Sequence, residues 1–327
     1  MTNWMQSALL AGVIGLVAGS VSAQQPATAA KPRVLAPGVV TVIPAAPQEE
    51  EMFSGPRPLI EVPANIPKLN EIKPNYEALT KTLNEQAKSA VLRRTIWNLE
   101  FAFKPMRMIM VDVPQPSGKM QKKLIWYMVY RVKNKGQHWK PADKDDDFGH
   151  KIPVVEKVDQ PLRFFPHFLL RANEFDKEYL DRVIPAAFEP IKARELPDKP
   201  LFDSLTISGV EVPVSDERND RSVWGVVTWE DVDPRIDYFS VFVQGLTNAY
   251  RYEDPDGAYK AGAAPGTGRK FTQKTLQLNF WRPGDAVNET EEEIRYGVRI
   301  EADPAEQKKI FQQFGIDRRL DSLWIYR

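Results

Sequence analysis

The stretch Lys122–Gly136, KKLIWYMVYRVKNKG, indicates the fold class of this chain more clearly than any other segment. Successive side chains of a strand point to opposite faces of a sheet, so apolar residues at every second position predict a strand with one buried face. That face carries Leu124, Trp126, Met128, Tyr130 and Val132. The residues Asn134-Lys135-Gly136 then favour a tight turn, and we expect a hairpin there.

The same alternation recurs along the rest of the chain, with clear examples at residues 97–103, 223–229, 239–243, 276–280 and 294–300. Many short antiparallel strands separated by turn residues are typical of sandwiches and barrels. We therefore predict a mainly β protein: an antiparallel β-sandwich, as one large or two tandem modules, with a few short helices and a disordered proline-rich arm before it.

Three helices are expected from the sequence. One follows Asn75, where apolar residues recur at helical spacing up to residue 91. A second is a short helix over residues 175–184, which Pro185 would stop. The third begins at Asp303-Pro304-Ala305-Glu306, an N-cap followed by proline at the first helical position, and ends at Gly315. The closing residues SLWIYR predict a last strand.

The first 23 residues have the features of a secretory signal peptide. Ala8–Gly19 is an apolar run too short to span a bilayer comfortably, and Val21-Ser22-Ala23 offers small residues for cleavage before Gln24. The segment before the run contains no Lys or Arg, so an uncleaved membrane anchor is the alternative. We expect a periplasmic or secreted protein that meets the membrane only if this segment is retained.

Composition shifts divide the remaining chain. Residues 24–70 are rich in Pro and Ala and show no sustained periodicity, which predicts a disordered linker. We expect a β-rich module with an N-terminal helix over residues 71–198, and a β-sandwich module with a C-terminal helix and strand over residues 199–327. The stretch KARELPDKP, residues 192–200, is the candidate boundary between them.

Charge and cysteine content exclude several classes of function. The chain of 327 residues has 44 Lys and Arg against 44 Asp and Glu, without the positive excess of a nucleic-acid-binding protein. It contains no Cys, which excludes disulfides, thiol nucleophiles and thiolate metal sites. The segment GAAPGTGRK, residues 262–270, misses the spacing of a phosphate-binding loop. We expect neither nucleic acid nor nucleotide as a partner.

The acidic segment between two predicted strands, within TWEDVDPRIDYFSVFVQGL at residues 228–246, is the candidate metal site. Glu230, Asp231 and Asp233 supply carboxylates for calcium, which takes six to eight oxygen ligands. The favoured interpretation is a plain turn, since Asp side chains bond the local backbone and Pro234 fixes φ. A second acidic run, at residues 143–147, begins with EF-hand spacing but lacks the required Gly and closing Glu.

The sequence shows no motif typical of an enzyme. The three His, at positions 138, 150 and 167, lack metal-site spacing, and there is no G-x-S-x-G nucleophile motif. Glycoside hydrolysis needs a pair of carboxylates whose separation a sequence does not give, so it stays open. Trp139, which follows the NKGQH turn, is the candidate ligand-stacking residue, with packing as its favoured role.

The form WYMVYRVKNKG, residues 126–136, resembles a strand and turn common in immunoglobulin-like modules of bacterial envelope proteins. The resemblance covers about 15 residues and implies a fold class only. We therefore expect an exported, non-catalytic structural or interaction protein of the cell envelope, with an unknown protein or glycan partner and no cofactor. The alternatives are a carbohydrate-binding or carbohydrate-active protein and a calcium-binding adhesive module.

Overall fold

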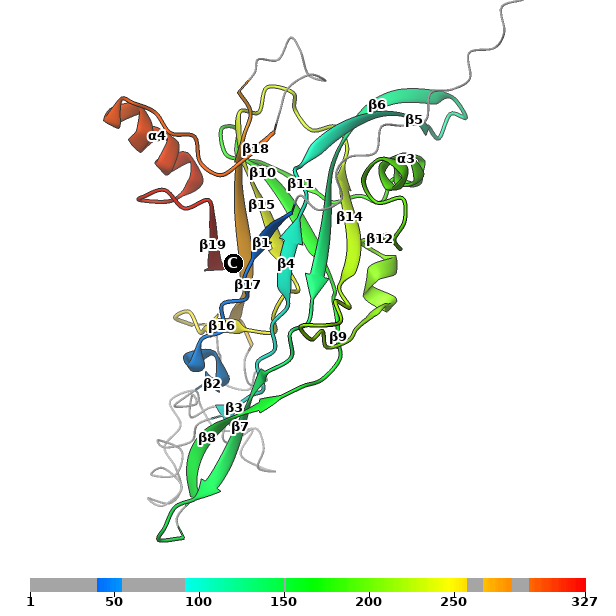
Figure 1. The fold of residues 1–327 in the computed structure, drawn as a ribbon. Helices are drawn as coiled ribbons and strands as arrows, with labels where there is room; N and C mark the ends of the chain where they lie inside the picture. Colours follow the sequence, from blue (N-terminus) through cyan, green and yellow to red (C-terminus); the bar gives the residue numbers. More distant parts are fainter. Residues whose placement is uncertain (1–39, 55–91, 150, 258–266, 284–293) are drawn as a thin grey trace, which may run out of the picture. The chain divides into compact units, whose positions relative to one another are not determined.

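The computed structural model describes residues 40–54, 92–149, 151–257, 267–283 and 294–327. The expected signal peptide over residues 1–23 and the helix expected after Asn75 lie outside these residues and stay predictions. The described elements build two main β-sheets and two α-helices (Figure 1).

The first main sheet runs in the order β1 (Thr41–Ile43), β4 (Glu100–Phe103), β6 (Met120–Lys133), β14 (Val223–Trp229) and β12 (Phe202–Asp203). The strand β5 (Arg107–Pro114) also pairs with β6, and every pairing in this sheet is antiparallel except that of β12 with β14. The long strand β6 therefore organises the sheet.

The second main sheet runs in the order β11 (Lys177–Leu180), β10 (His167–Ala172), β15 (Tyr238–Gln244), β17 (Lys270–Trp281) and β16 (Tyr250–Glu253). β18 (Arg295–Tyr296) and β19 (Ser322–Tyr326) pair with β17 as well. Three two-stranded sheets complete the set: β2 (Phe53–Ser54) with β3 (Leu92–Arg93), β7 (His138–Asp145) with β8 (Lys151–Val158), and β9 (Leu162–Arg163) with β13 (Glu211–Val212).

The two main sheets pack face to face around an aromatic core, which confirms the predicted sandwich. Ring centroids meet across the sheets at 5.4 Å between Trp126 and Phe239, and at 4.9 Å between Tyr130 and Phe168. The face predicted for β6 is the one that enters this core, since Trp126, Met128, Tyr130 and Val132 are all buried there. Aromatic pairs of this kind add to the stability that apolar burial provides.

Each sheet has its outer face covered by a helix (Figure 1). α3 (Pro185–Glu195) packs Ala187 and Ile191 against outward residues of the first sheet, among them Tyr127 and Val129. α4 (Pro304–Phe314) places Ile310 and Phe314 in a separate apolar cluster that includes Tyr238 of β15 and Leu323 of β19. The described residues therefore form four layers, helix–sheet–sheet–helix. Neither of these helices is long and apolar enough to cross a membrane.

One helix prediction is confirmed and another is wrong. Asp303 caps α4 by accepting a hydrogen bond from Ala305 N, and Gly315 ends the helix with a φ of 69°. The helix expected over residues 175–184 is instead the strand β11, and Pro185 starts α3 rather than stopping a helix. Proline lacks an N–H, and the first helical position is where that loss costs least.

Strand predictions near the boundary also need correction. The strand expected at Leu205 and Ile207 is the 3₁₀-helix η2 (Thr206–Gly209).

The expected division into modules of residues 71–198 and 199–327 is not seen, because β6 pairs with β14 and β10 pairs with β15. Both sheets therefore mix strands from the two halves, which makes one large sandwich.

Part of the predicted linker belongs to the fold. β1 adds to the edge of the first sheet beside β4, and the 3₁₀-helix η1 (Glu49–Met52) follows it. The buried Lys274 ammonium forms an ion pair with Glu51, whose Oε1 also accepts a hydrogen bond of 2.7 Å from Tyr326. Residues 40–54 are therefore part of the folded structure, although the disordered linker was expected to cover residues 24–70.

The turn at Asn134-Lys135-Gly136 exists, but it does not make a hairpin. β6 pairs with β4, β5 and β14, whereas β7 pairs with β8. The turn therefore carries the chain out of the first main sheet into a separate two-stranded ribbon, and this change of direction forms one wall of the candidate site.

Candidate functional site

The acidic segment expected as a metal site, residues 230–237, connects β14 of the first sheet to β15 of the second. Val232 and Ile236 are buried in the core and anchor the connection. Within the described part of the chain, no group of three or more His, Asp or Glu side chains is placed to hold a metal ion. The calcium hypothesis for Glu230, Asp231 and Asp233 stays a prediction.

Each of these three carboxylates has a cation as a neighbour. Glu230 forms ion pairs with Arg182 and Lys123, and Lys123 Nζ also lies 3.0 Å from Asp231 Oδ2. The hydrogen bond to Asp231 raises the pKa of Lys123 above its usual value. Arg235 donates to Asp233 over 2.7 Å and lowers the pKa of that carboxyl to about 2. These contacts account for the acidic composition without a bound ion.

Trp139 lies in a different place, on β7 opposite Lys157 of β8. Its backbone exchanges two hydrogen bonds with Ile96, of 2.9 and 2.8 Å. Its half-buried ring packs against Met52, Ile96 and Ala249, and the Lys157 ammonium lies 5.0 Å from the ring centroid. The backbone hydrogen bonds and this packing leave Trp139 little freedom to move when a ligand binds.

This tryptophan lines a groove of about 670 Å³. The groove joins four segments that are distant in the sequence: the N-terminal segment, the end of β6 with its turn, the β7–β8 ribbon and the loop after β13. Its lining residues are Ala45, Pro47, Lys133, Lys135, Gly136, Gln137, Trp139, Lys157, Asp159, Val214, Ser215, Asp216 and Glu217. We call it the Trp139 groove.

The buried Asn134 holds three of these segments together. Its side-chain amide donates to Gln160 O over 2.9 Å and to Val212 O over 3.1 Å, and its Oδ1 accepts from Gly136 N over 2.9 Å. Its backbone carbonyl accepts from Ser215 N over 2.7 Å. Buried polar networks with all partners present fix a single arrangement, so the groove is preformed.

The turn beside Asn134 is conformationally unusual. Gly136 and Gln137 both have left-handed backbones, with φ of 65° and 54°. Asp159 Oδ1 accepts a hydrogen bond of 2.6 Å from Gln137 N and lies against Gly136. A non-glycine residue in this region is uncommon and costs free energy, and such residues cluster at functional sites. Gln137 is exposed at the edge of the groove.

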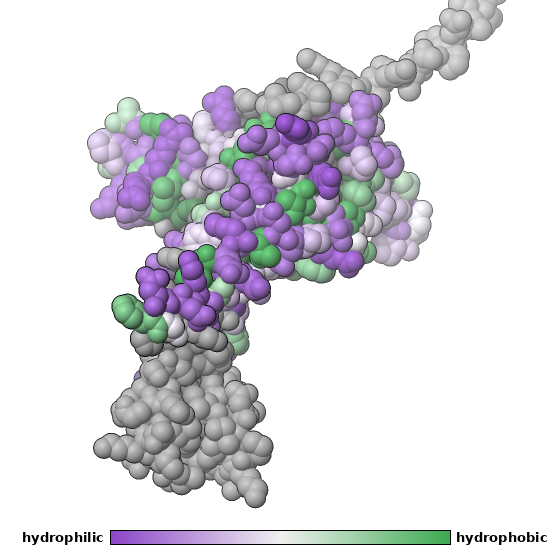
Figure 2. Space-filling view, turned by 60° about the horizontal axis from the view of Figure 1, so that its bottom comes forward, coloured by the Kyte–Doolittle hydropathy of each residue, from purple (hydrophilic) through white to green (hydrophobic). Residues whose placement is uncertain are grey.

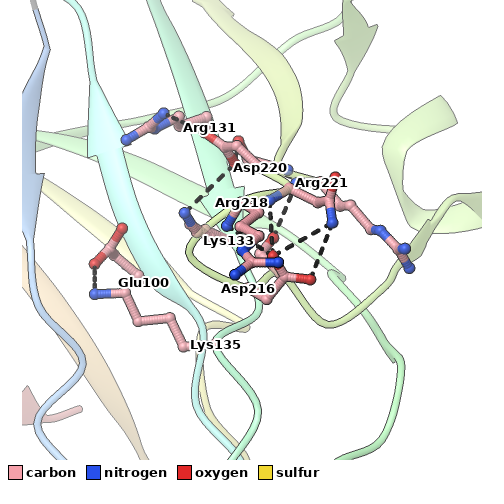
Figure 3. A network of polar contacts seen from close by, with 11 residues as sticks. Glu100, Arg131, Lys133, Lys135, Asp216, Arg218, Asp220 and Arg221 are labelled. Atoms are coloured by element: carbon pink, nitrogen blue, oxygen red, sulfur yellow. Dashed lines mark hydrogen bonds and ion pairs between the residues drawn. The ribbon is translucent and has the colours of Figure 1, made fainter.

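Charged residues of both signs surround the groove, and Figure 3 shows the part of this network near β6. The Asp220 carboxylate takes two cations, with Arg131 at 3.1 Å and Lys133 at 3.6 Å, while Lys135 pairs with the buried Glu100. Asp216 turns back into its own loop and accepts from Arg218 N and Asn219 N over 2.7 and 2.8 Å.

The pKa of Asp216 lies below its usual value because its carboxylate accepts hydrogen bonds, and the bond from the Asn219 side chain contributes most. Burial lowers the pKa of His138, the residue before Trp139, and so favours the neutral form of its imidazole. The face drawn in Figure 2 is mainly hydrophilic, with hydrophobic residues in small groups between polar ones. The lining of the groove combines one aromatic ring with many polar groups.

Two smaller cavities offer less room or less aromatic surface than the groove. One, of about 230 Å³, lies at the start of α3 and is lined by apolar side chains such as Val183, Ile184 and Phe188. The other, of about 310 Å³, lies beside Trp224, whose ring is nearly buried. The guanidinium groups of Arg295 and Arg299 lie over the ring of Trp281. This tryptophan does not line the Trp139 groove.

The sequence offered Trp139 as a candidate and gave no sign of the other residues that line the groove. The NKG turn was visible, yet nothing in the linear sequence places Lys157, Asp159 or Asp216 beside it. Comparison of this chain with family models, curated proteins and solved structures found no match.

Proposed function

We propose that this chain is an exported, non-catalytic binding protein of the cell envelope, and that the Trp139 groove holds a saccharide. The observation that carries the proposal is one tryptophan ring in the wall of a groove lined by lysine, carboxylate, amide and hydroxyl side chains. A sugar ring presents apolar C–H faces to an aromatic ring and hydroxyls to polar groups, so this combination suits it.

Asp216 is poorly suited to act as the general acid of a glycosidase. A glycosidase needs one carboxylic acid with a raised pKa to protonate the leaving group. The pKa of Asp216 is lowered because its oxygens accept hydrogen bonds from Asn219 and from Arg218 N. An acid of this kind stays ionised at neutral pH and is a poor proton donor.

The preformed walls also suit a binding protein. The Asn134 network and the Ile96–Trp139 backbone hydrogen bonds hold the groove in one shape. Ordering of the protein then costs little free energy on association, so even a few contacts give measurable affinity. The predicted export signal would bring such a protein to the glycans outside the cytoplasm.

The test is calorimetric titration of the full chain with a panel of soluble neutral and acidic oligosaccharides. We expect at least one to bind, and Trp139→Ala to weaken that binding about tenfold or more, as for loss of one aromatic contact. Phe148→Ala is the matched control, because Phe148 lies on the same ribbon and is 85% exposed but does not line the groove.

Two results would overturn the proposal: no oligosaccharide in the panel binds, or Trp139→Ala binds as tightly as the natural chain. Thermal unfolding of both variants checks that each is folded. Release of reducing sugar from a bound oligosaccharide would show instead that the groove belongs to a hydrolase.

A further inference from the structure

We infer that the saccharide taken by the Trp139 groove is acidic, and that Lys157 binds its carboxylate with help from Lys133 and Lys135. The inference rests on the proposed function and adds to it the chemical class of the ligand. It follows from how far each charged group of the groove is already engaged.

Two of the three carboxylates that line the groove, Asp159 and Asp216, accept hydrogen bonds from the protein itself. Asp159 accepts from the Gln137 backbone N–H, and Asp216 accepts from two backbone N–H groups of its own loop. Each oxygen that bonds an N–H has less capacity left for a sugar hydroxyl. Of the lining carboxylates, Glu217 is exposed at the rim and is the least engaged by described residues.

The ammonium groups are engaged much less. Lys157 is exposed and forms no ion pair with any described residue; its ammonium lies 5.0 Å from the centroid of the Trp139 ring. Lys133 shares the single Asp220 carboxylate with Arg131, so two cations face one anion. Lys135 pairs with Glu100 but remains 63% exposed.

Lys157 places a positive charge beside the ring on which the sugar would stack. Trp139 and Lys157 are direct neighbours across the β7–β8 ladder. Because both backbone groups of Trp139 bond Ile96, this is a non-hydrogen-bonded pair, in which side chains lie closest. The Lys157 ammonium lies over the Trp139 ring, so a sugar ring that stacks there displaces this flexible side chain to the edge of the ring. At that edge the ammonium meets the substituents of the sugar, and a carboxylate is the substituent that gains most from it.

The probes are trigalacturonate and its fully methyl-esterified form, which have the same sugar rings but differ in charge. We expect calorimetry of the full chain to show trigalacturonate binding about tenfold tighter at low salt, since a charge-assisted hydrogen bond contributes about that factor. The advantage should shrink as salt screens the charges.

Lys157→Gln should remove most of the difference between the two probes, whereas Lys157→Arg should keep it. Lys140→Gln is the matched control, because Lys140 is an exposed lysine of β7 outside the groove lining. It should leave both affinities unchanged. These exposed positions make loss of folding a minor concern, and the midpoint of thermal unfolding verifies it.

The failures can be told apart. Equal affinity for both probes, or a Lys157→Gln variant that still prefers trigalacturonate, overturns the acidic preference while saccharide binding stands. Binding of neutral oligosaccharides from the panel without binding of trigalacturonate has the same meaning. If nothing in the panel binds, the proposed function fails and this inference fails with it.

Discussion

At the scale of single residues, Gly136 is the position whose identity the groove most depends on. Its φ of 65° lies in the left-handed region, where a side chain is strained. A Cβ atom there would lie 2.2 Å from Asp159 Oδ1, the atom that accepts the Gln137 N–H. The close approach of Asp159 to the turn therefore requires glycine.

We predict that Gly136→Ala lowers the free energy of unfolding by about 2–4 kcal/mol, from backbone strain plus displacement of Asp159. Gly118→Ala is the matched control: its φ is 77°, but no atom lies within 4 Å of the added Cβ. It should cost about 1 kcal/mol, the strain alone. Urea denaturation measures both, and equal costs would show that the Asp159 contact does not matter.

At the scale of the element, α3 is held to the first sheet by a buried ionic cluster as well as by apolar packing. Glu195, in the last turn, lies 2.7 Å from Lys104 Nζ and 3.2 Å from Arg107 Nε, and accepts a hydrogen bond of 2.8 Å from Tyr127. Burial raises the pKa of Tyr127 well above its usual range, so the phenol stays a donor. The apolar part of the contact follows from Ala187 and Ile191, but the sequence gives no sign of the ionic part.

Because both charges are buried, removal of one partner should cost more than removal of the pair. We predict that Lys104→Met lowers the free energy of unfolding by about 3 kcal/mol, as for a buried carboxylate that loses its buried partner and keeps only the partly exposed Arg107 as a cation. Adding Glu195→Leu should cost much less than the sum of the two single changes, a coupling that a double-mutant cycle in urea measures. Strict additivity would contradict this view of the cluster.

At the scale of the whole molecule, the central feature is that each main sheet draws strands from both halves of the chain. β14 needs β6 as its neighbour, and β15 needs β10. Without these partners the central strands would expose core residues such as Trp229 and Phe239, together with a row of unpaired backbone groups.

We therefore predict that a fragment of residues 199–327, and one of residues 71–198, each fail to fold alone. Near-ultraviolet circular dichroism should be weak, and urea unfolding should lack a cooperative transition. The full chain is the control. A cooperative transition in either isolated fragment would show that the halves are independent modules after all.

What the sequence by itself determined is local. The alternation in KKLIWYMVYRVKNKG predicted which face of β6 enters the core between the sheets, because side chains in a strand must alternate. It did not predict that the opposite face, with Tyr127 and Val129, is buried as well. The Asp303 cap and Gly315 predicted α4, because unpaired N–H and C=O groups at helix ends need those residue types. The immunoglobulin-like resemblance, the export signal and the absence of an enzyme activity stay predictions.

Tertiary structure alone decided which segments meet. The same local pattern allows β6 to end in a hairpin or to pass into another sheet, and strand pairing over long distances in the sequence made the choice. Pro185 likewise stops or starts a helix depending on what its neighbours pack against. The Trp139 groove exists because Asn134 bonds Gln160 and Val212 across the fold, and such contacts between distant residues leave no periodic signal in the chain.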